Sequence, residues 1–74
     1  MYILIELQTN GGQTANIVTS FEDRLEAFSA YHSVLASAAV SSVETHAAAI
    51  LDERGNLIQR EFYRHVPDLT SGDA

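Results

Sequence analysis

The chain has 74 residues, ten carboxylates against four arginines, no lysine, and a formal net charge of −6 at neutral pH. The core of so small a domain supplies only about 3–5 kcal/mol, and such domains commonly add a disulfide, a metal or a partner subunit. The chain has no cysteine, and its three histidines lack zinc-finger or HExxH spacing, so neither a disulfide nor a metal site is predicted. We therefore expect self-association into a homo-oligomer.

Charge and hydropathy also limit the partners of the chain. A net negative charge opposes attraction to phosphate backbones, so a nucleic acid duplex is not an expected partner. No apolar run approaches the roughly 18 residues of a membrane span, and the first residues lack the basic segment of a signal peptide. The sequence therefore predicts a cytoplasmic protein with no membrane partner.

The first part of the chain has the pattern of a β-hairpin. Residues 2–8 and 14–20 are rich in β-branched and large apolar side chains, and the segment TNGGQT between them is typical of a tight turn. Either Asn10-Gly11 or Gly11-Gly12 can occupy the two central turn positions. The sequence predicts the hairpin and leaves its register open by one or two residues.

A helix is predicted to begin near Ser20 and Asp23, which resemble a capping box, and to end at Ser41 and Ser42. Two apolar rows follow helical spacing. One row contains Phe21, Leu25, Phe28, His32, Leu35 and Ala39, and the other contains Ala27, Tyr31, Val34 and Ala38. We expect the first row to pack on the sheet, so that Phe28→Ala costs about 3–5 kcal/mol. The alanines fit either close packing on the sheet or the approach of a helix from a second subunit.

A second hairpin is predicted from residues 43–51 and 57–65, joined by the turn DERGN at residues 52–56. A loop of Glu53-Arg54-Gly55 places Asp52 opposite Asn56. Counting back from that pair gives the cross-strand pairs Ile50–Ile58, Ala48–Arg60, His46–Phe62 and Glu44–Arg64. This register predicts that one face of the sheet carries His46, Arg60, Phe62 and Arg64.

These elements predict an α+β fold in the order β-β-α-β-β, an antiparallel four-stranded sheet with one helix packed across it. Residues 1–65 form the single domain. Residues 66–74 contain Pro67, Gly72 and acidic residues without periodicity, which predicts a mobile C-terminal tail.

The polar and aromatic residues of the second half are the candidates for a binding site. If the His32 row of the helix lies on the His46 face of the sheet, nitrogen donors surround an aromatic ring. The predicted ligand-binding residues are Tyr31, His32, His46, Arg60, Phe62, Tyr63, Arg64 and His65. The plainer interpretation also stays open: the histidines are core or surface residues and the tyrosines are packing residues. No catalytic residue, metal ligand or cofactor is predicted.

Residues 31–65, YHSVLASAAVSSVETHAAAILDERGNLIQREFYRH, combine a Tyr-His pair, an Ala-Ser-rich segment, a histidine in a strand, a glycine turn and a terminal Tyr-x-His. This pattern resembles small uncharacterised proteins that phages and prophages of gut bacteria encode. The resemblance implies a phage origin and a bacterial host cell. It draws attention to Tyr31, His32, Ser41, Ser42, His46, Gly55, Tyr63 and His65.

One class of small phage proteins, the oligomers that enclose immune-signalling nucleotides between subunits, is similar to the predicted architecture. The resemblance therefore implies a homo-oligomer that sequesters a small anionic, nucleotide-derived immune signal. The alternative is an acidic interaction module that binds and inhibits a host or phage protein, although the carboxylates are scattered rather than clustered. An enzyme is the least supported hypothesis. His32 or His46 would need a nucleophile or an ordered water nearby and a carboxylate to orient the ring, which Glu44 or Glu61 could supply, but nothing in the spacing requires such a site.

Overall fold

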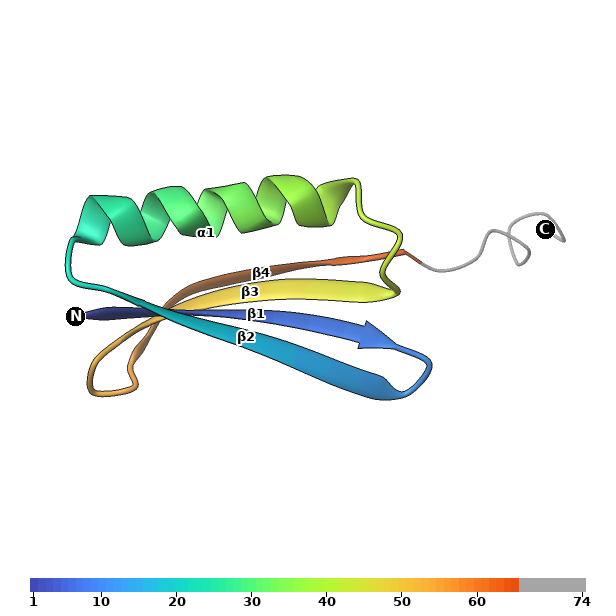
Figure 1. The fold of residues 1–74 in the computed structure, drawn as a ribbon, viewed down its shortest axis with the longest axis horizontal. Helices are drawn as coiled ribbons and strands as arrows, with labels where there is room; N and C mark the ends of the chain where they lie inside the picture. The colour runs from blue at the N-terminus through green and yellow to red at the C-terminus, as the bar shows by residue number, and fades with distance from the viewer. Residues whose placement is uncertain (66–74) are drawn as a thin grey trace, which may run out of the picture.

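The computed structural model describes residues 1–65, which form four strands and one helix (Figure 1). The elements are β1 (Tyr2–Asn10), β2 (Gln13–Phe21), α1 (Arg24–Ala39), β3 (Thr45–Asp52) and β4 (Leu57–Arg64). The strands form one antiparallel sheet in the order β2-β1-β3-β4. The predicted α+β fold and its element order are confirmed. The tail predicted at residues 66–74 lies outside the described residues, and the homo-oligomer stays a prediction.

The first hairpin turns on two glycines. Gly11 and Gly12 have φ angles of 58° and 82°, the left-handed values that a type I′ turn requires at both central positions. The strands therefore pair from Asn10 with Gln13 to Tyr2 with Phe21. The structure thus selects the Gly11-Gly12 turn from the two alternatives in the sequence.

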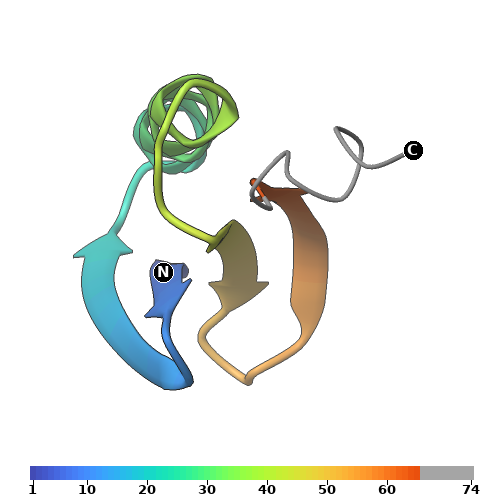
Figure 2. The same cartoon turned by 90° about the vertical axis from the view of Figure 1, so that its right-hand side faces the viewer.

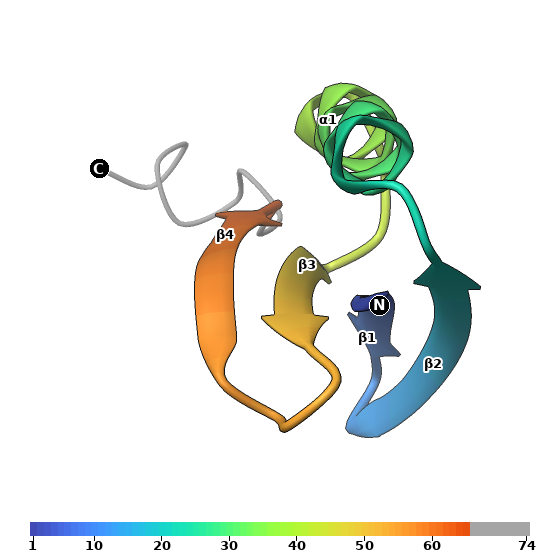
Figure 3. The same cartoon turned by 90° about the vertical axis from the view of Figure 1, so that its left-hand side faces the viewer.

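Helix α1 lies on one side of the sheet, above the two central strands β1 and β3 (Figures 2 and 3). Its N-cap is Asp23, whose Oδ2 accepts a hydrogen bond of 3.0 Å from the Glu26 backbone N–H. That bond satisfies one of the amide donors that a helix start leaves without a partner. The helix then runs in the direction opposite to β2 (Figure 1) and ends at Ala39, with the exposed Val40 as its C-cap.

The helix is rotated relative to the sequence prediction. Ala27, Tyr31 and Ala38 are the buried residues of α1, whereas Leu25 is 75% exposed and His32 is exposed. The row containing Tyr31 faces the sheet, and the expectation that the Leu25 and His32 row packs there was wrong. Alanines facing the sheet let the helix backbone approach β3 closely, and the Tyr31 ring fills the space that remains.

The core is small. Its fully buried cluster consists of Leu4, Ala27, Tyr31, Ala48 and Ile50, with Phe28, Val34 and Leu35 partly buried around it. The rings of Phe28 and Tyr31 meet edge to face, with centroids 6.2 Å apart. All of this packing lies between α1 and the side of the sheet that it covers.

The second hairpin contains a β-bulge that the sequence analysis missed. The predicted turn is correct, because the Asp52 N–H donates to the Asn56 carbonyl at 3.0 Å. Leu51 pairs with Leu57, but the next residue, Ile50, pairs with Gln59, so Ile58 is the extra residue of a bulge. Every later pair shifts by one position, and a shift of one residue moves each side chain of β4 to the opposite face.

The predicted cross-strand pairs beyond the bulge are therefore wrong. His46 lies opposite Tyr63, and Ala48 lies opposite Glu61. Arg60 lies opposite Ala49, Phe62 opposite Ala47, and Arg64 opposite Thr45. Since Ala48 and His46 are buried beneath the helix, Arg60, Phe62 and Arg64 belong to the other side of the sheet.

We call the side of the sheet opposite α1 the open face, because no other described residue covers it (Figures 2 and 3). Alternation along each strand assigns side chains to it. Its residues are Ile3, Ile5, Leu7 and Thr9 in β1; Thr14, Asn16, Val18 and Ser20 in β2; Thr45, Ala47, Ala49 and Leu51 in β3; and Leu57, Arg60, Phe62 and Arg64 in β4.

Candidate functional site

The structure divides the predicted site residues between four places. Tyr31 and His46 are buried between the helix and the sheet, and Tyr63 lies opposite His46 on the same side of the sheet but is 38% exposed. Arg60, Phe62 and Arg64 lie on the open face. His32 is exposed on α1, against the rings of Phe28 and Tyr31. His65 follows β4, and its Nε2 lies 2.8 Å from the Ala38 carbonyl oxygen. The single pocket that the sequence predicted is therefore not formed within one chain.

The covered side of the sheet holds a polar pair that links the two central strands. His46 is 4% exposed, and its Nε2 lies 2.6 Å from Glu6 Oε2. The same carboxylate oxygen accepts a hydrogen bond of 3.0 Å from the Gln8 side-chain amide. Burying a charge or a donor without such partners costs several kcal/mol, so each group stabilises the placement of the other.

Two polar atoms of the covered side have no hydrogen-bond partner among residues 1–65. They are the Tyr31 hydroxyl and Nδ1 of His46, and both are buried. Burial is the main cause that raises the pKa of Tyr31 above its usual value of 10.0, and the negative charge of Glu61 adds to the shift. The Tyr31 hydroxyl is therefore neutral under ordinary conditions.

The open face presents two guanidinium groups around an aromatic ring. Arg60, Phe62 and Arg64 alternate along β4, and Phe62 is 49% exposed. Four residues of a strand span about 13 Å, so the two arginines begin that far apart with the ring between them. Beside them lies a shallow hollow of about 320 Å³, floored by Ala47 and Ala49. It is bordered by Leu7, Thr45, Ala48, Arg60, Glu61 and Phe62.

The charge of the open face differs from that of the chain as a whole. None of the carboxylate residues among residues 1–65 belongs to it, whereas two of the four arginines do. Glu61 borders the hollow from the edge of β4, where its Oε1 accepts a 3.0 Å hydrogen bond from the Phe62 N–H. An anion would therefore meet two arginines and one bordering carboxylate on this face.

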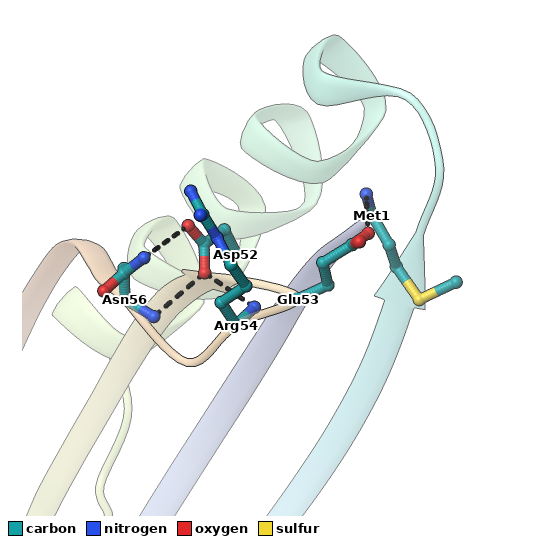
Figure 4. Close-up of polar contacts among 5 residues, drawn as sticks. All are labelled: Met1, Asp52, Glu53, Arg54 and Asn56. Atoms are coloured by element: carbon teal, nitrogen blue, oxygen red, sulfur yellow. Dashed lines mark hydrogen bonds and ion pairs between the residues drawn. The ribbon is translucent and has the colours of Figure 1, made fainter.

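The β3–β4 turn and the start of the chain form a second polar cluster (Figure 4). The Asp52 carboxylate accepts hydrogen bonds from the backbone N–H groups of Arg54 and Asn56 and from the Asn56 side-chain amide, at 2.8–2.9 Å. These bonds, led by the one from the Asn56 side chain, lower the pKa of Asp52 below its usual 3.8. Nearby, the N-terminal ammonium of Met1 lies 2.9 Å from Glu53 Oε1. The cluster fixes the turn and has no ligand-like geometry of its own.

Sequence reasoning missed Glu6 as a partner of His46. The signal was a single carboxylate within the apolar residues 2–7, at a position that alternation assigns to the same side as Leu4. It also missed the contact of Glu44 with the first turn, where the Gly11 N–H donates to Glu44 Oε1 at 3.2 Å. Both contacts join segments more than 30 residues apart, so no local pattern predicts them.

Comparisons with protein-family models, with curated proteins and with solved structures gave no match. Within residues 1–65, no group of three or more His, Cys, Asp or Glu side chains is arranged to hold a metal ion. The helix of that region is neither long nor apolar enough to cross a membrane. The function is therefore argued from the open face and the covered side alone.

Proposed function

We propose that the protein is a homo-oligomeric binding protein that sequesters a small anionic, nucleotide-type ligand on its open face. The observation that supports this proposal is the distribution of charge: in a chain with a net charge of −6, the open face has two arginines and no carboxylate of its own. The exposed ring of Phe62 lies between those arginines in sequence and on the same face. A planar ring with anionic groups matches this set of side chains.

The spacing of the arginines defines the ligand further. Arg60 and Arg64 leave the backbone at positions about 13 Å apart. Their guanidinium groups reach the two sides of a ligand ring that stacks on Phe62, but they do not easily bind the same phosphate. The site therefore favours a ligand with two anionic groups flanking a planar ring, such as a dinucleotide or a nucleoside diphosphate derivative. That the ligand is an immune signal follows from the resemblance to phage proteins alone, and the ligand panel below tests it.

Calorimetric titration against cyclic dinucleotides and ADP-ribose derivatives tests the proposal. A charge-assisted hydrogen bond is worth about 1.5–3 kcal/mol, so Arg60→Gln should weaken binding about 10- to 150-fold. Arg54→Gln is the matched control, because Arg54 lies in the β3–β4 turn away from the open face (Figure 4). Glu61→Gln should tighten binding, since it removes the carboxylate that borders the hollow.

The proposal fails if no member of the panel binds the wild-type protein. It also fails if Arg54→Gln loses as much affinity as Arg60→Gln, because binding would then depend on overall charge rather than on the open face.

The alternative function, an acidic module that binds another protein, has weaker support. Acidic residues do precede α1, at Glu22 and Asp23, and lie in the β3–β4 turn, at Glu53, and these two segments are at the same end of the fold (Figure 1). Arg24 and the N-terminal ammonium lie at the same end and offset part of that charge. The open face is the more distinctive surface.

A further inference from the structure

We propose that the open face is the interface between two copies of this chain, and that the ligand lies at the rim of that interface, between β4 of one copy and β2 of the other. The placement of the ligand rests on the proposed function, whereas the interface does not. The size of the open face supports this interface. Four strands about 4.8 Å apart, with about 3.3 Å rise over eight residues, give a face of roughly 19 Å by 26 Å. Two such faces bury roughly 1,000 Å² together, which reaches the lower limit of about 1,000 Å² for a specific interface.

The shape of the open face also supports this interface. The large side chains of the open face, Ile5 and Leu7, are in β1, while the neighbouring strand β3 has the small Ala47 and Ala49. A two-fold axis parallel to the strands, running between β1 and β3, places β1 of each copy over β3 of the other. Leu7 of one copy then faces the hollow above Ala47 of the second. The face is therefore complementary to itself, with large residues over small ones as packed interfaces require.

The charge of β4 favours a two-fold axis parallel to the strands over one perpendicular to them. With the axis parallel to the strands, β4 of each copy lies over β2 of the other. Arg60 and Arg64 then approach Thr14, Asn16 and Val18, which are neutral. An axis perpendicular to the strands would instead stack β4 on β4 and bring the arginines of both copies together, which like-charge repulsion opposes.

In this arrangement each ligand site is shared between two copies. The first contributes the arginines and Phe62 from β4, and the second contributes hydroxyl and amide groups from β2, such as Asn16. The apolar strands β1 and β3 form the centre of the interface, and the two ligand sites lie at its polar rims. Such a dry centre with a polar rim is the usual anatomy of protein interfaces.

Two neighbouring residues of β2 provide a matched pair for testing the interface. Val18 is 58% exposed on the open face, and Ile17 is 53% exposed on the other side of the same strand. In sedimentation equilibrium, we expect the wild-type protein to be a dimer at micromolar concentration. Val18→Arg should dissociate at least tenfold more readily, because its charge would meet Arg60 of the other copy, and Ile17→Arg should match the wild type. A monomeric wild type overturns the proposal. Equal weakening in both variants also overturns it, because the dimer would then not depend on the open face.

Cysteine crosslinking tests the arrangement independently of variant stability, because the chain has no cysteine of its own. A bismaleimide too short to span the sheet should join two Ala47→Cys chains, since β3 lies beside the proposed axis. It should not join two Phe62→Cys chains, whose β4 strands lie at opposite edges of the dimer. Crosslinking of Phe62→Cys but not of Ala47→Cys would indicate β4 over β4 and would overturn the arrangement.

Mixing two binding-deficient variants tests the shared ligand site. Asn16→Ala keeps Arg60, and Arg60→Gln keeps Asn16, so a mixed dimer has one site with both wild-type groups. Calorimetry of the mixture with the tightest ligand of the panel should recover wild-type affinity at one site per mixed dimer. No recovery, with wild type both dimeric and binding, overturns the shared site. If wild type is dimeric but binds no ligand of the panel, the proposed function fails and the interface stands.

Discussion

The two sides of the sheet have opposite characters although the same four strands form both. The covered side has the buried core residues of the sheet, Leu4, Ala48 and Ile50, and one buried polar pair, Glu6 and His46. The open face has exposed apolar side chains and two arginines, with no carboxylate of its own. We infer that the covered side holds the fold together and that the open face is available for binding. Substitutions on each side should separate these two roles.

The largest effect is expected from truncating the centre of the covered side. Tyr31 is fully buried, so Tyr31→Ala should cost about 3–5 kcal/mol of unfolding free energy. Leu25→Ala, at a helix position that is 75% exposed, should change stability by less than about 0.5 kcal/mol. Phe28→Ala should fall between them because Phe28 is only partly buried. Urea denaturation measures all three, and a greater cost at Leu25 than at Tyr31 would contradict the observed rotation of the helix.

The rotation of the helix shows which features of α1 could be predicted from the sequence and which could not. Periodicity located α1 and its start near Asp23, but two apolar rows follow the same spacing, so it could not decide which row faces the sheet. The decision depends on the fit of Ala27 and Tyr31 against Ala48, a contact between distant segments. The sequence thus predicted the elements and their order, and left the helix orientation to tertiary packing.

The bulge at Ile58 had a larger consequence for the predicted site. The turn residues from Asp52 to Asn56 were interpreted correctly, and the first pair beyond them, Leu51 with Leu57, follows from that turn. One extra residue then moved Arg60, Phe62 and Arg64 away from His46. A bulge has no strong local signature in the segment LIQR, so the residue types of the site were predictable whereas their common face was not.

The next prediction compares one polar pair on each side of the sheet. Glu6→Ala removes the partner of the buried His46 Nε2 and should cost about 1.5–3 kcal/mol. Thr9→Ala breaks the 2.9 Å hydroxyl contact with Thr14 on the open face, which is exposed, and should cost less than about 0.5 kcal/mol. Denaturation by urea measures both changes. Similar losses in the two variants would contradict the division between the two sides.

A smaller change of opposite sign is expected at the Tyr31 hydroxyl. This group is buried and has no hydrogen-bond partner among residues 1–65, so Tyr31→Phe should stabilise the protein by about 1 kcal/mol. Because the pKa of Tyr31 is raised in the folded state, its neutral form stabilises the fold below pH 10, and this contribution is lost as the pH rises through the raised pKa. Tyr31→Phe should therefore lose less stability than wild type above pH 10. A destabilised Tyr31→Phe would mean that the hydroxyl is hydrogen-bonded in solution.

The smallest effect concerns Asp52, which fixes the β3–β4 turn. That turn sets the register in which β4 begins to pair with β3, and the register decides which side of the sheet each residue of β4 occupies. Hydrogen bonds from Asn56 and from the Arg54 N–H lower the pKa of Asp52 in the folded state. Its ionised form therefore stabilises the fold above about pH 4, the usual pKa of an aspartate, and this contribution is lost as the pH falls through the lowered pKa. Stability measured between pH 2 and 5 should decline more steeply for wild type than for Asp52→Asn. Asn56→Ala should have an intermediate slope, because it removes only the side-chain donor that contributes most to the shift. If Asn56→Ala kept the full slope of wild type, the hydrogen bond from the Asn56 side chain would not be what stabilises the Asp52 carboxylate, and the turn would be held by its backbone donors alone.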